Sequence, residues 1–400
     1  MAPPLPLEEA QARLLALASP LPIERVPVGE ALGRYLAEPL IARRTQPAAN
    51  LSAMDGYAAR GADLPGPWHV IGESAAGHPF AGTVGAGEAV RISTGAHLPA
   101  GADMVLLQED AQRDGDQLAL TGTPPAPPHK HIRRCGGDFA DGALLLASGT
   151  ALGPAQLALI IGAGHSHVAV RRRPRVVVID SGDELAADPA LCPPHQIPAS
   201  NGVMLAALCA ALPCDVARIG PVADTLDALA AAFARAAAAD VIVTSGGVSV
   251  GDHDLIRPAL AEWGASLDFW KVAIKPGKPL LIARRGAQLV VGLPGNPVSS
   301  HVTAYLFLLP LLRHLLGATG ALPRSIPARL AEPLGLSGAR REFLRARWDG
   351  ANVTARLNQD SGALATLAAS NALIDRPAHA PAIEAGSTVP VYLLDHGGMA

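Results

Sequence analysis

From Arg175 to about residue 316, short β-branched apolar runs alternate with longer stretches whose apolar residues follow helical spacing. The short runs predict strands at 175–180, 216–219, 241–244, 267–269, 280–283 and 289–291. The longer stretches predict helices at 200–212, 224–239, 254–263 and 295–316. Alternating strands and helices are typical of a doubly wound, mostly parallel α/β sheet. We therefore predict a central α/β domain over residues 172–318.

The remaining chain shows two β-rich patterns and two isolated helices. Short extended runs between frequent Gly and Pro predict an inserted β-rich domain over 44–139, and a similar pattern predicts a barrel-like β domain over 319–400. Helical spacing predicts an amphipathic helix over 7–18, and Pro154 is typical of the first residue of a helix that ends near 162. We expect these two helices to pack together, so that 1–43 and 140–171 form one discontinuous linker and dimer domain, helical and extended in structure.

Composition narrows the class of protein. The 400 residues are 49% hydrophobic and 17% charged, which is typical of globular proteins. A net charge of −3 and an aromatic content of 4% give no reason to expect a nucleic-acid partner. The longest apolar run, 302–312, is too short to span a membrane, and acids occupy the place of a signal peptide's basic region. We expect a cytoplasmic protein without a membrane partner, whose four cysteines, which lack a CxxC pair, are reduced thiols.

The loop after the strand at 241–244 carries the most distinctive chemistry. It contains glycines, hydroxyls and acids in close succession: Ser245, Gly246, Gly247, Ser249, Gly251, Asp252 and Asp254. A buried strand that leads into such a loop presents backbone N–H groups to a phosphate, and glycine lets the backbone approach the ligand closely. Acids fit an anion site when a cation shares it. The pattern predicts a site for a phosphorylated ligand and a divalent metal.

Two further loops are expected at the same edge of the sheet. Ser181, Gly182 and Glu184 follow the strand at 175–180, and the segment 294–297 follows the strand at 289–291. The carboxyl ends of parallel strands share one edge of a sheet, so these loops should converge there. Three of the four lysines fall within 271–278, while Arg carries nearly all other positive charge. A lysine cluster between prolines favours phosphate binding over a solvated basic loop.

Several motifs are ambiguous when taken singly. Asp55-Gly56 and Thr94-Gly95 are typical of turns, and Ser370 fits either a capping turn or a ligand contact. His165 and His167 would share a strand face, but no third metal ligand is evident, and their roles stay open.

Taken together and in order, the motifs are specific. They are SAMDGYA at 52–58, STGAHLPAGADMV at 93–105, Gly-Gly-Asp at 136–138, SGDEL at 181–185, DVIVTSGGVSVGDHD at 240–254, IKPGKP at 274–279, GLPGNPVS at 292–299 and AASNALI at 368–374. This set closely resembles the molybdopterin molybdenumtransferases, the MoeA-like family that includes the gephyrin E-domain. The resemblance extends over residues 7–395.

The resemblance implies an L-shaped homodimer of four-domain subunits that performs the last step of molybdenum cofactor synthesis. Its substrates would be adenylylated molybdopterin and molybdate, and Mg²⁺ would support hydrolysis of the adenylyl anhydride. The site would lie between the α/β domain of one subunit and the region around Asp55 of the other. Further expected partners are the adenylyltransferase that makes the substrate and the molybdoenzymes that accept the cofactor.

The resemblance also implies roles for individual residues. The expected catalytic residues are Asp55, Glu184, Asp240, Lys275 and Lys278. The expected substrate-binding residues are Thr94, Asp138, Ser181, Gly182, Ser245, Gly246, Gly247, Ser249, Pro294, Gly295, Asn296, Pro297 and Ser370. Asp252 and Asp254 are the candidate metal ligands, and the choice between them stays open because acid placement varies in this motif.

Two other functions compete with this one. A molybdopterin adenylyltransferase would use the same α/β domain, but the β-rich segments 44–139 and 319–400 argue against it. A non-catalytic cofactor-binding scaffold is disfavoured because the chain shows no long linker or interaction tail. The preference for molybdenum over tungsten and the identity of the acceptor stay open.

Overall fold

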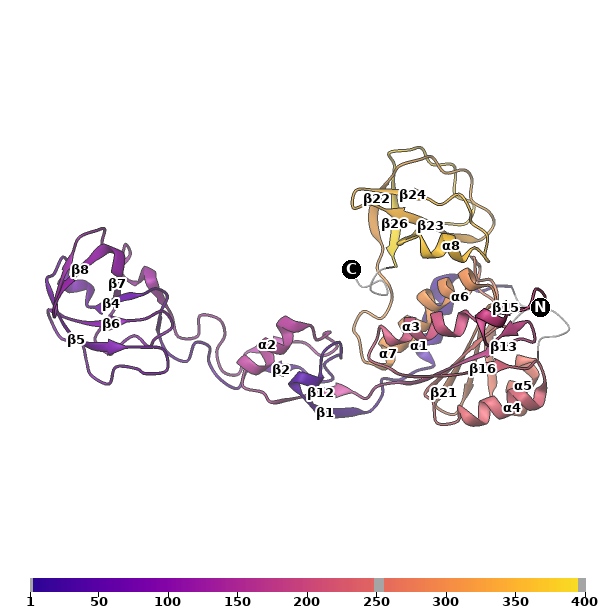
Figure 1. The fold of residues 1–400 in the computed structure, drawn as a ribbon, viewed down its shortest axis with the longest axis horizontal. Helices are drawn as coiled ribbons and strands as arrows, with labels where there is room; N and C mark the ends of the chain where they lie inside the picture. The colour runs from indigo at the N-terminus through magenta and orange to yellow at the C-terminus, as the bar shows by residue number, and fades with distance from the viewer. Residues whose placement is uncertain (1–2, 248–254, 395–400) are drawn as a thin grey trace.

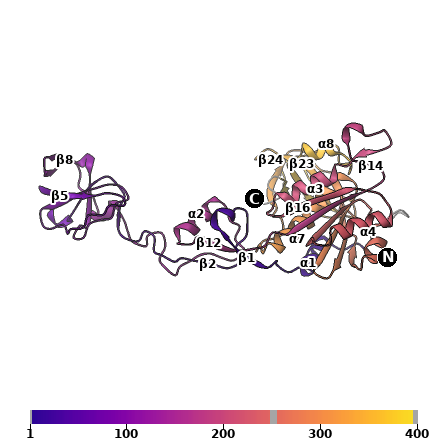
Figure 2. The same ribbon diagram turned by 60° about the horizontal axis from the view of Figure 1, so that its bottom comes forward.

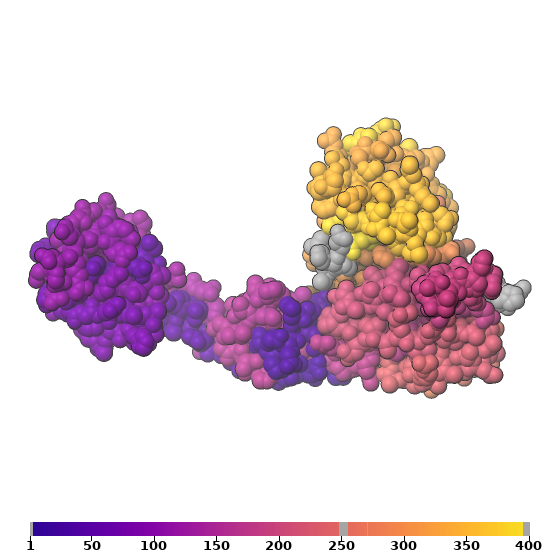
Figure 3. Space-filling view, viewed as in Figure 1, coloured from indigo at the N-terminus to yellow at the C-terminus, as the bar shows by residue number. Residues whose placement is uncertain are grey.

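The chain forms an L in the computed structural model, which describes residues 3–247 and 255–394 (Figure 1). A six-stranded sheet, called here the distal sheet, lies at the end of the long arm. A narrow neck joins it to a second six-stranded sheet, the main sheet. The C-terminal barrel lies over the helices on one face of the main sheet (Figure 1), and Figure 3 shows the neck holding the distal part well away from both.

The main sheet has the strand order β16-β13-β17-β21-β20-β18. Its strands are β13 (Arg175–Ser181), β16 (Asp215–Val222), β17 (Val241–Ser245), β18 (Ser266–Trp270), β20 (Leu281–Arg285) and β21 (Gln288–Leu293). The neighbours β16, β13, β17 and β21 are parallel, while β20 runs antiparallel to both β21 and β18. The expected mostly parallel α/β sheet is confirmed.

Helices cover both faces of the main sheet (Figure 2). They are α1 (Leu7–Ala16), α3 (Asn201–Ala210), α4 (Leu226–Arg235), α5 (Ile256–Glu262), α6 (Pro297–Thr303) and α7 (Leu309–Leu315). Val241 and Val243 of β17 pack in the core that contains α1, α3 and α7, while Ile242 packs in the core under α4 and α5. Because successive strand residues point to opposite faces, one apolar run supplies both layers.

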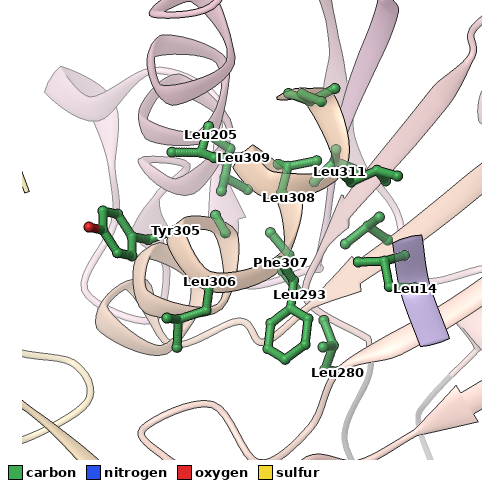
Figure 4. Close-up of a cluster of buried hydrophobic side chains, with 14 of the residues drawn as sticks. Leu14, Leu205, Leu280, Leu293, Tyr305, Leu306, Phe307, Leu308, Leu309 and Leu311 are labelled. Atoms are coloured by element: carbon green, nitrogen blue, oxygen red, sulfur yellow. The ribbon is translucent and has the colours of Figure 1, made fainter. Parts of the chain in front are cut away.

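The long C-terminal helix of the main sheet is interrupted, in contrast to the continuous helix expected over 295–316. A π-helical turn at Ala304–Leu308 separates α6 from α7. Pro310 lacks the N–H that would bond the carbonyl oxygen of Leu306 four residues earlier. Gln11 of α1 fills this gap, since its Nε2 donates to that oxygen at 2.8 Å. Leu14 of α1 joins the same core (Figure 4).

The neck forms where the chain leaves and returns. It consists of β1 (Ile23–Pro27), β12 (His167–Arg171), β2 (Leu40–Ile41), β11 (Leu144–Leu146) and α2 (Pro154–Gly162). β1 pairs with β12, and β2 pairs with β11, each antiparallel. The expected packing of α2 against the N-terminal helix is wrong: Ile160 of α2 packs with Val28 in a small core of the neck, whereas α1 packs under the main sheet. The apolar side of α1 packs in the larger core of the main sheet instead.

The distal sheet and the barrel complete the fold. The distal strands are β4 (Gly56–Ala59), β5 (Trp68–Ser74), β6 (Glu88–Ile92), β7 (Met104–Leu107), β8 (Ala111–Asp114) and β9 (Gln117–Leu120), with β3 (Leu51–Ser52) paired to β10 (Ile132–Arg133) beside them. The barrel strands are β22 (Ile326–Leu330), β23 (Arg341–Trp348), β24 (Asn352–Ala355), β25 (Ala372–Arg376) and β26 (Thr388–Leu393). They close in the order β23-β24-β22-β26-β25, since β25 also pairs with β23. Within residues 3–247 and 255–394, no helix is both long and apolar enough to cross a bilayer.

Candidate functional site

Three loops meet at the carboxyl edge of β13, β17 and β21, which we call the rim. These strands are parallel neighbours, and their register places Asp180 beside Ser245 and Ser245 beside Leu293. The loops that begin at Ser181, Gly246 and Pro294 therefore leave the sheet side by side. This is the convergence that the alternating pattern implied.

Glycine is required where the loop after β17 turns. Gly246 and Gly247 have φ values of +94° and +63°, a left-handed region that disfavours other residues. A Cβ on Gly246 would lie 2.7 Å from the carbonyl oxygen of Ser181. The backbone of one rim loop thus packs directly on that of its neighbour, which leaves no room for a side chain between them.

Asn201, the first residue of α3, ties the rim together. Its Nδ2 donates to the Ser245 hydroxyl at 2.9 Å and to the Gly295 carbonyl oxygen at 2.7 Å. From the sequence, Asn201 was expected only to lie at the start of the helix over 200–212. No local signal indicates that its side-chain amide bridges loops that are distant in the chain.

The rim also contains buried polar atoms that have no hydrogen-bond partner among the described residues. They include Ser181 Oγ, Asn201 Oδ1 and Asp180 Oδ1. Burial raises the pKa of Asp180, and the Arg218 guanidinium, 3.9 Å from its Oδ2, opposes that shift. Buried polar groups in proteins are nearly always paired, so such a concentration is typical of a ligand site.

The lysine loop lies beside α6. β19 (Ile274–Lys275) pairs with β23 of the barrel, and Lys275 Nζ donates to Glu342 Oε1 at 3.0 Å. A Cβ on Gly277 would contact Ser299 and Thr303 of α6. Lys278 is exposed. The basic pair therefore borders the helix that begins directly after the Pro294 loop, and Glu342 is a neighbour that sequence reasoning missed.

The barrel contributes to the same region. Asn296 Nδ2 donates to Ser361 Oγ at 2.9 Å, and the N–H of Val298 donates to the Ser361 carbonyl oxygen at 3.0 Å. Pro297 is the first residue of α6. Ser370 follows the short helix α8 (Leu364–Ala368), and its hydroxyl donates to Thr366 O at 2.7 Å.

Glu184 stands at the outer side of the rim. Its side chain is exposed, and its carboxylate lies over Gly182, where a Cβ would come within 2.4 Å of Oε2. The next residues form β14 (Leu185–Ala186), which pairs with β15 (Ile197–Pro198). Glu184 is thus free to face a ligand.

Asp55 directly precedes β4, and Thr94 follows β6, two strands of the distal sheet that Figure 1 shows far from the main sheet of the same chain. The N–H of Thr94 donates to Asp55 Oδ1 at 2.7 Å. This bond, with a smaller effect from Arg91, lowers the pKa of Asp55, so the exposed group is a carboxylate at neutral pH. Asp138 is exposed where the chain returns to the neck, with its N–H donating to Gln46 O at 3.0 Å.

Asp240 does not lie at the rim. It precedes β17, so it sits at the amino edge of the main sheet, opposite to Ser245. The Arg172 guanidinium donates two hydrogen bonds of 2.8 Å to its carboxylate. The expectation of Asp240 among the rim acids overlooked that the two ends of one strand lie on opposite edges.

The expected metal ligands Asp252 and Asp254, and also Ser249, lie outside the described residues. Within the described residues, no group of three or more His, Cys, Asp and Glu side chains could hold a metal ion. His165 Nε2 lies 2.8 Å from the Ile41 carbonyl oxygen, and His167 Nδ1 lies 3.1 Å from Ser166 Oγ. The described residues thus provide acidic and anion-binding groups but no complete set of metal ligands.

Comparison with known proteins agrees with this geometry. The chain matches the MoeA N-terminal region, domains I and II, over residues 5–164, a probable molybdopterin-binding domain over 177–314, and the MoeA C-terminal region, domain IV, over 327–394. It is 34% identical to the molybdopterin molybdenumtransferase of Nostoc sp. over 93% of this chain and 88% of that protein. It is 31% identical to the Staphylococcus aureus (strain MRSA252) protein of the same name over 98% and 96%.

Solved structures show the same overall fold. The chain is similar to the molybdopterin biosynthesis moeA protein from Pyrococcus horikoshii OT3, with a TM-score of 0.84, 27% identity, and coverage of 98% of this chain and 100% of that one. A second moeA structure from that organism gives a TM-score of 0.81 at 31% identity, with coverage of 98% and 99%. The fold, the motifs and the sequence identity over nearly the full length all indicate one family, and the chain belongs to the molybdopterin molybdenumtransferase family.

Proposed function

We propose that this protein inserts molybdenum into molybdopterin, using adenylylated molybdopterin and molybdate as substrates, in the cytoplasm. The observation that carries the proposal is the convergence of the Ser181, Gly246 and Pro294 loops at one rim beside a lysine loop. A phosphoanhydride carries adjacent negative charges, and this rim has a glycine turn, while the lysine loop borders α6, the helix that follows the Pro294 loop.

The reaction has two parts. Water attacks the adenylyl phosphorus, the bond from that phosphorus to the bridging oxygen breaks, and AMP leaves from molybdopterin phosphate. The two dithiolene sulfurs then bind molybdenum, and the displaced molybdate oxygens take up the thiol protons and leave as water. In our proposal Lys275 and Lys278 hold the anionic groups, and Glu184 orients water or molybdate. The rim is shaped by the hydroxyls of Ser181 and Ser245 and by the backbone of Gly182, Gly246, Gly247, Pro294, Gly295, Asn296 and Pro297.

We propose that the second half of the site comes from a partner subunit in a homodimer. Asp55 directly precedes β4 of the distal sheet, and the neck holds this part of the chain away from the main sheet (Figure 3), so a role for Asp55 in the chemistry requires a second copy. Asp55 is ionised at neutral pH because the Thr94 N–H stabilises its charge. The Asp55 carboxylate can therefore accept a hydrogen bond from an attacking water, and Thr94 fixes the orientation of that carboxylate. Asp138 would lie at the margin of the proposed site.

Mg²⁺ is part of the proposal through Asp252 and Asp254. When bound, the ion would neutralise charge on the phosphoanhydride. Glu184 is an exposed acid at the rim, so its carboxylate can face a neighbouring cation.

The test is to follow AMP release by the pure protein from adenylylated molybdopterin with Mg²⁺, with and without molybdate. We expect molybdate to accelerate AMP release and the product to reconstitute a molybdenum-free acceptor enzyme. Absence of adenylate consumption with both substrates and Mg²⁺ would contradict the proposal. Formation of adenylylated molybdopterin from ATP would instead favour an adenylyltransferase.

A further inference from the structure

A pocket of about 730 Å³ lies between α3, the β14–β15 segment and α8. Its walls are mostly apolar, with Val203 and Met204 from α3 facing Leu364 and Leu367 of α8. Leu205, on another side of α3, packs in the main core instead (Figure 4). The volume lies in the range of pockets that bind small molecules, and the apolar walls suit a flat ring.

The pocket adjoins the rim without containing it. Ser200, which lines it, precedes Asn201, the residue whose amide contacts both Ser245 and Gly295. Gly220, another lining residue, packs on β13 so closely that a Cβ there would lie 2.6 Å from the Asp180 carbonyl oxygen. A ligand whose phosphate lies at the rim can therefore extend its remaining part into the pocket.

Among the residues that the structure describes, four polar side chains line the pocket: Ser200, Arg218, His301 and Ser370. His301 of α6 lines it, and burial lowers the pKa of this histidine to about 4, so its imidazole is neutral at physiological pH. Its Nδ1 has no hydrogen-bond partner within the described part of the chain. Arg218 also lines the pocket, with its guanidinium 3.9 Å from Asp180. A guanidinium can stack on a heteroaromatic face, and a neutral imidazole can bond a ring nitrogen or carbonyl.

We propose that this pocket binds a planar, uncharged nitrogen heterocycle of the substrate, with His301 hydrogen-bonded to the edge of the ring. The inference rests on the proposed function, because the substrate named there carries two such rings, pterin and adenine. Both share flatness, low charge and donor–acceptor edges. The ring end is bound by apolar walls and His301, separately from the phosphate end at the rim.

The experiment uses the full-length protein and two probes, AMP for the adenine end and 6-carboxypterin for the pterin end, each titrated calorimetrically. Val203→Trp fills the pocket from an exposed helix position, and Ala207→Trp places the same side chain one turn later on α3, outside the pocket lining. We expect Val203→Trp to weaken one of the probes at least about tenfold, while Ala207→Trp binds like the wild type. The probe that loses affinity identifies the ring.

A second pair of variants tests His301 itself. His301→Leu should weaken the same probe by about two- to tenfold, and His301→Gln, which keeps hydrogen-bonding groups, should retain more affinity. Unchanged affinity for both probes in Val203→Trp would overturn the inference. This outcome is distinct from failure of the proposed function, since molybdate-dependent AMP release by the wild type would persist. Pocket-dependent ring binding without turnover would support the pocket and contradict only the reaction.

Discussion

Arg172 and Asp240 form a two-point hydrogen bond at the amino edge of the main sheet, with both N–O distances at 2.8 Å. The N–H of Arg175 donates to the same carboxylate at 2.7 Å. Burial alone would raise the pKa of Asp240, but the bonds from Arg172 and Arg175 outweigh it and lower the pKa. The pair joins the chain segment that leaves the neck to the residue that precedes β17, and we therefore expect its role to be structural.

Asp240→Asn should therefore destabilise the protein without impairing its chemistry. We expect the free energy of unfolding to fall by about 1–3 kcal/mol at pH 7, because Arg172 loses a charged partner. A carboxylate with a lowered pKa stabilises the fold above its unfolded pKa and loses that effect as pH falls through the folded value. The difference in free energy of unfolding between Asp240→Asn and the wild type should thus become smaller at acidic pH. The two measurements are urea unfolding and the rate of AMP release per folded molecule. Normal stability with lost AMP release would instead show that Asp240 takes part in the reaction.

Gly246→Ala tests the close approach of the rim loops. The φ of +94° and the contact with Ser181 O predict both strain and displacement of the glycine turn. We expect a loss of roughly 1–3 kcal/mol in stability and strongly weakened adenylate binding. Gly286→Ala is the matched control, since its φ is +60° and its Cβ would meet no atom within 4 Å among the described residues. Equal effects of the two substitutions would rule out the contact as the cause.

Lys278→Ala tests the anion-binding role of the lysine loop. A charge-assisted hydrogen bond contributes about 1.5–3 kcal/mol, so we expect KM for the adenylylated substrate to rise about ten- to hundredfold. Lys130→Ala, on the exposed side of the distal part, serves as the control and should leave KM unchanged. Steady-state kinetics at several salt concentrations provide the measurement. An unchanged KM in Lys278→Ala would place this lysine outside the substrate site.

His301 predicts a specific pH dependence of stability. Burial lowers its pKa from an ordinary value of 6.5 to about 4 in the folded state. Between these values the unfolded chain binds a proton that the folded chain does not, so the free energy of unfolding falls as pH decreases from about 7 to 4. The total linkage is at most about 3 kcal/mol. His301→Gln should flatten this slope in urea titrations, whereas exposed His129→Gln should keep it; identical slopes in all three proteins would contradict the burial of a neutral imidazole.

The sequence predicted the sheet well because its signals are local. Each apolar run from β13 to β21 is bounded by turn residues, and parallel strands place their following loops at one edge, which brought Ser181, Gly246 and Pro294 together. The interruption of the last helix also had a local cause in Pro310. The side chain that bonds the freed Leu306 carbonyl oxygen, Gln11, lies almost three hundred residues away in the sequence.

Other features depend on contacts that no local pattern encodes. Asn201, Glu342 and Ser361 join loops that are distant in the chain, so their roles required the structure. Asp240 was misplaced because proximity in sequence to the glycine loop does not imply the same end of the strand. The packing of α1 was missed because amphipathic spacing identifies an apolar face but not the surface that covers it.

The central claim is that Asp55 of one subunit and Lys278 of another complete a single site. Heterodimers that combine an Asp55→Ala chain with a Lys278→Ala chain, isolated with two different affinity tags, test it most directly through molybdate-dependent AMP release. Each parent homodimer should fold normally and show little activity when the adenylylated substrate is kept well below the wild-type KM. We predict that the heterodimer recovers about half of the wild-type activity, because one of its two shared sites contains neither substitution. A heterodimer as inactive as its parents would show that both residues act within one chain or in separate sites, and would contradict the account.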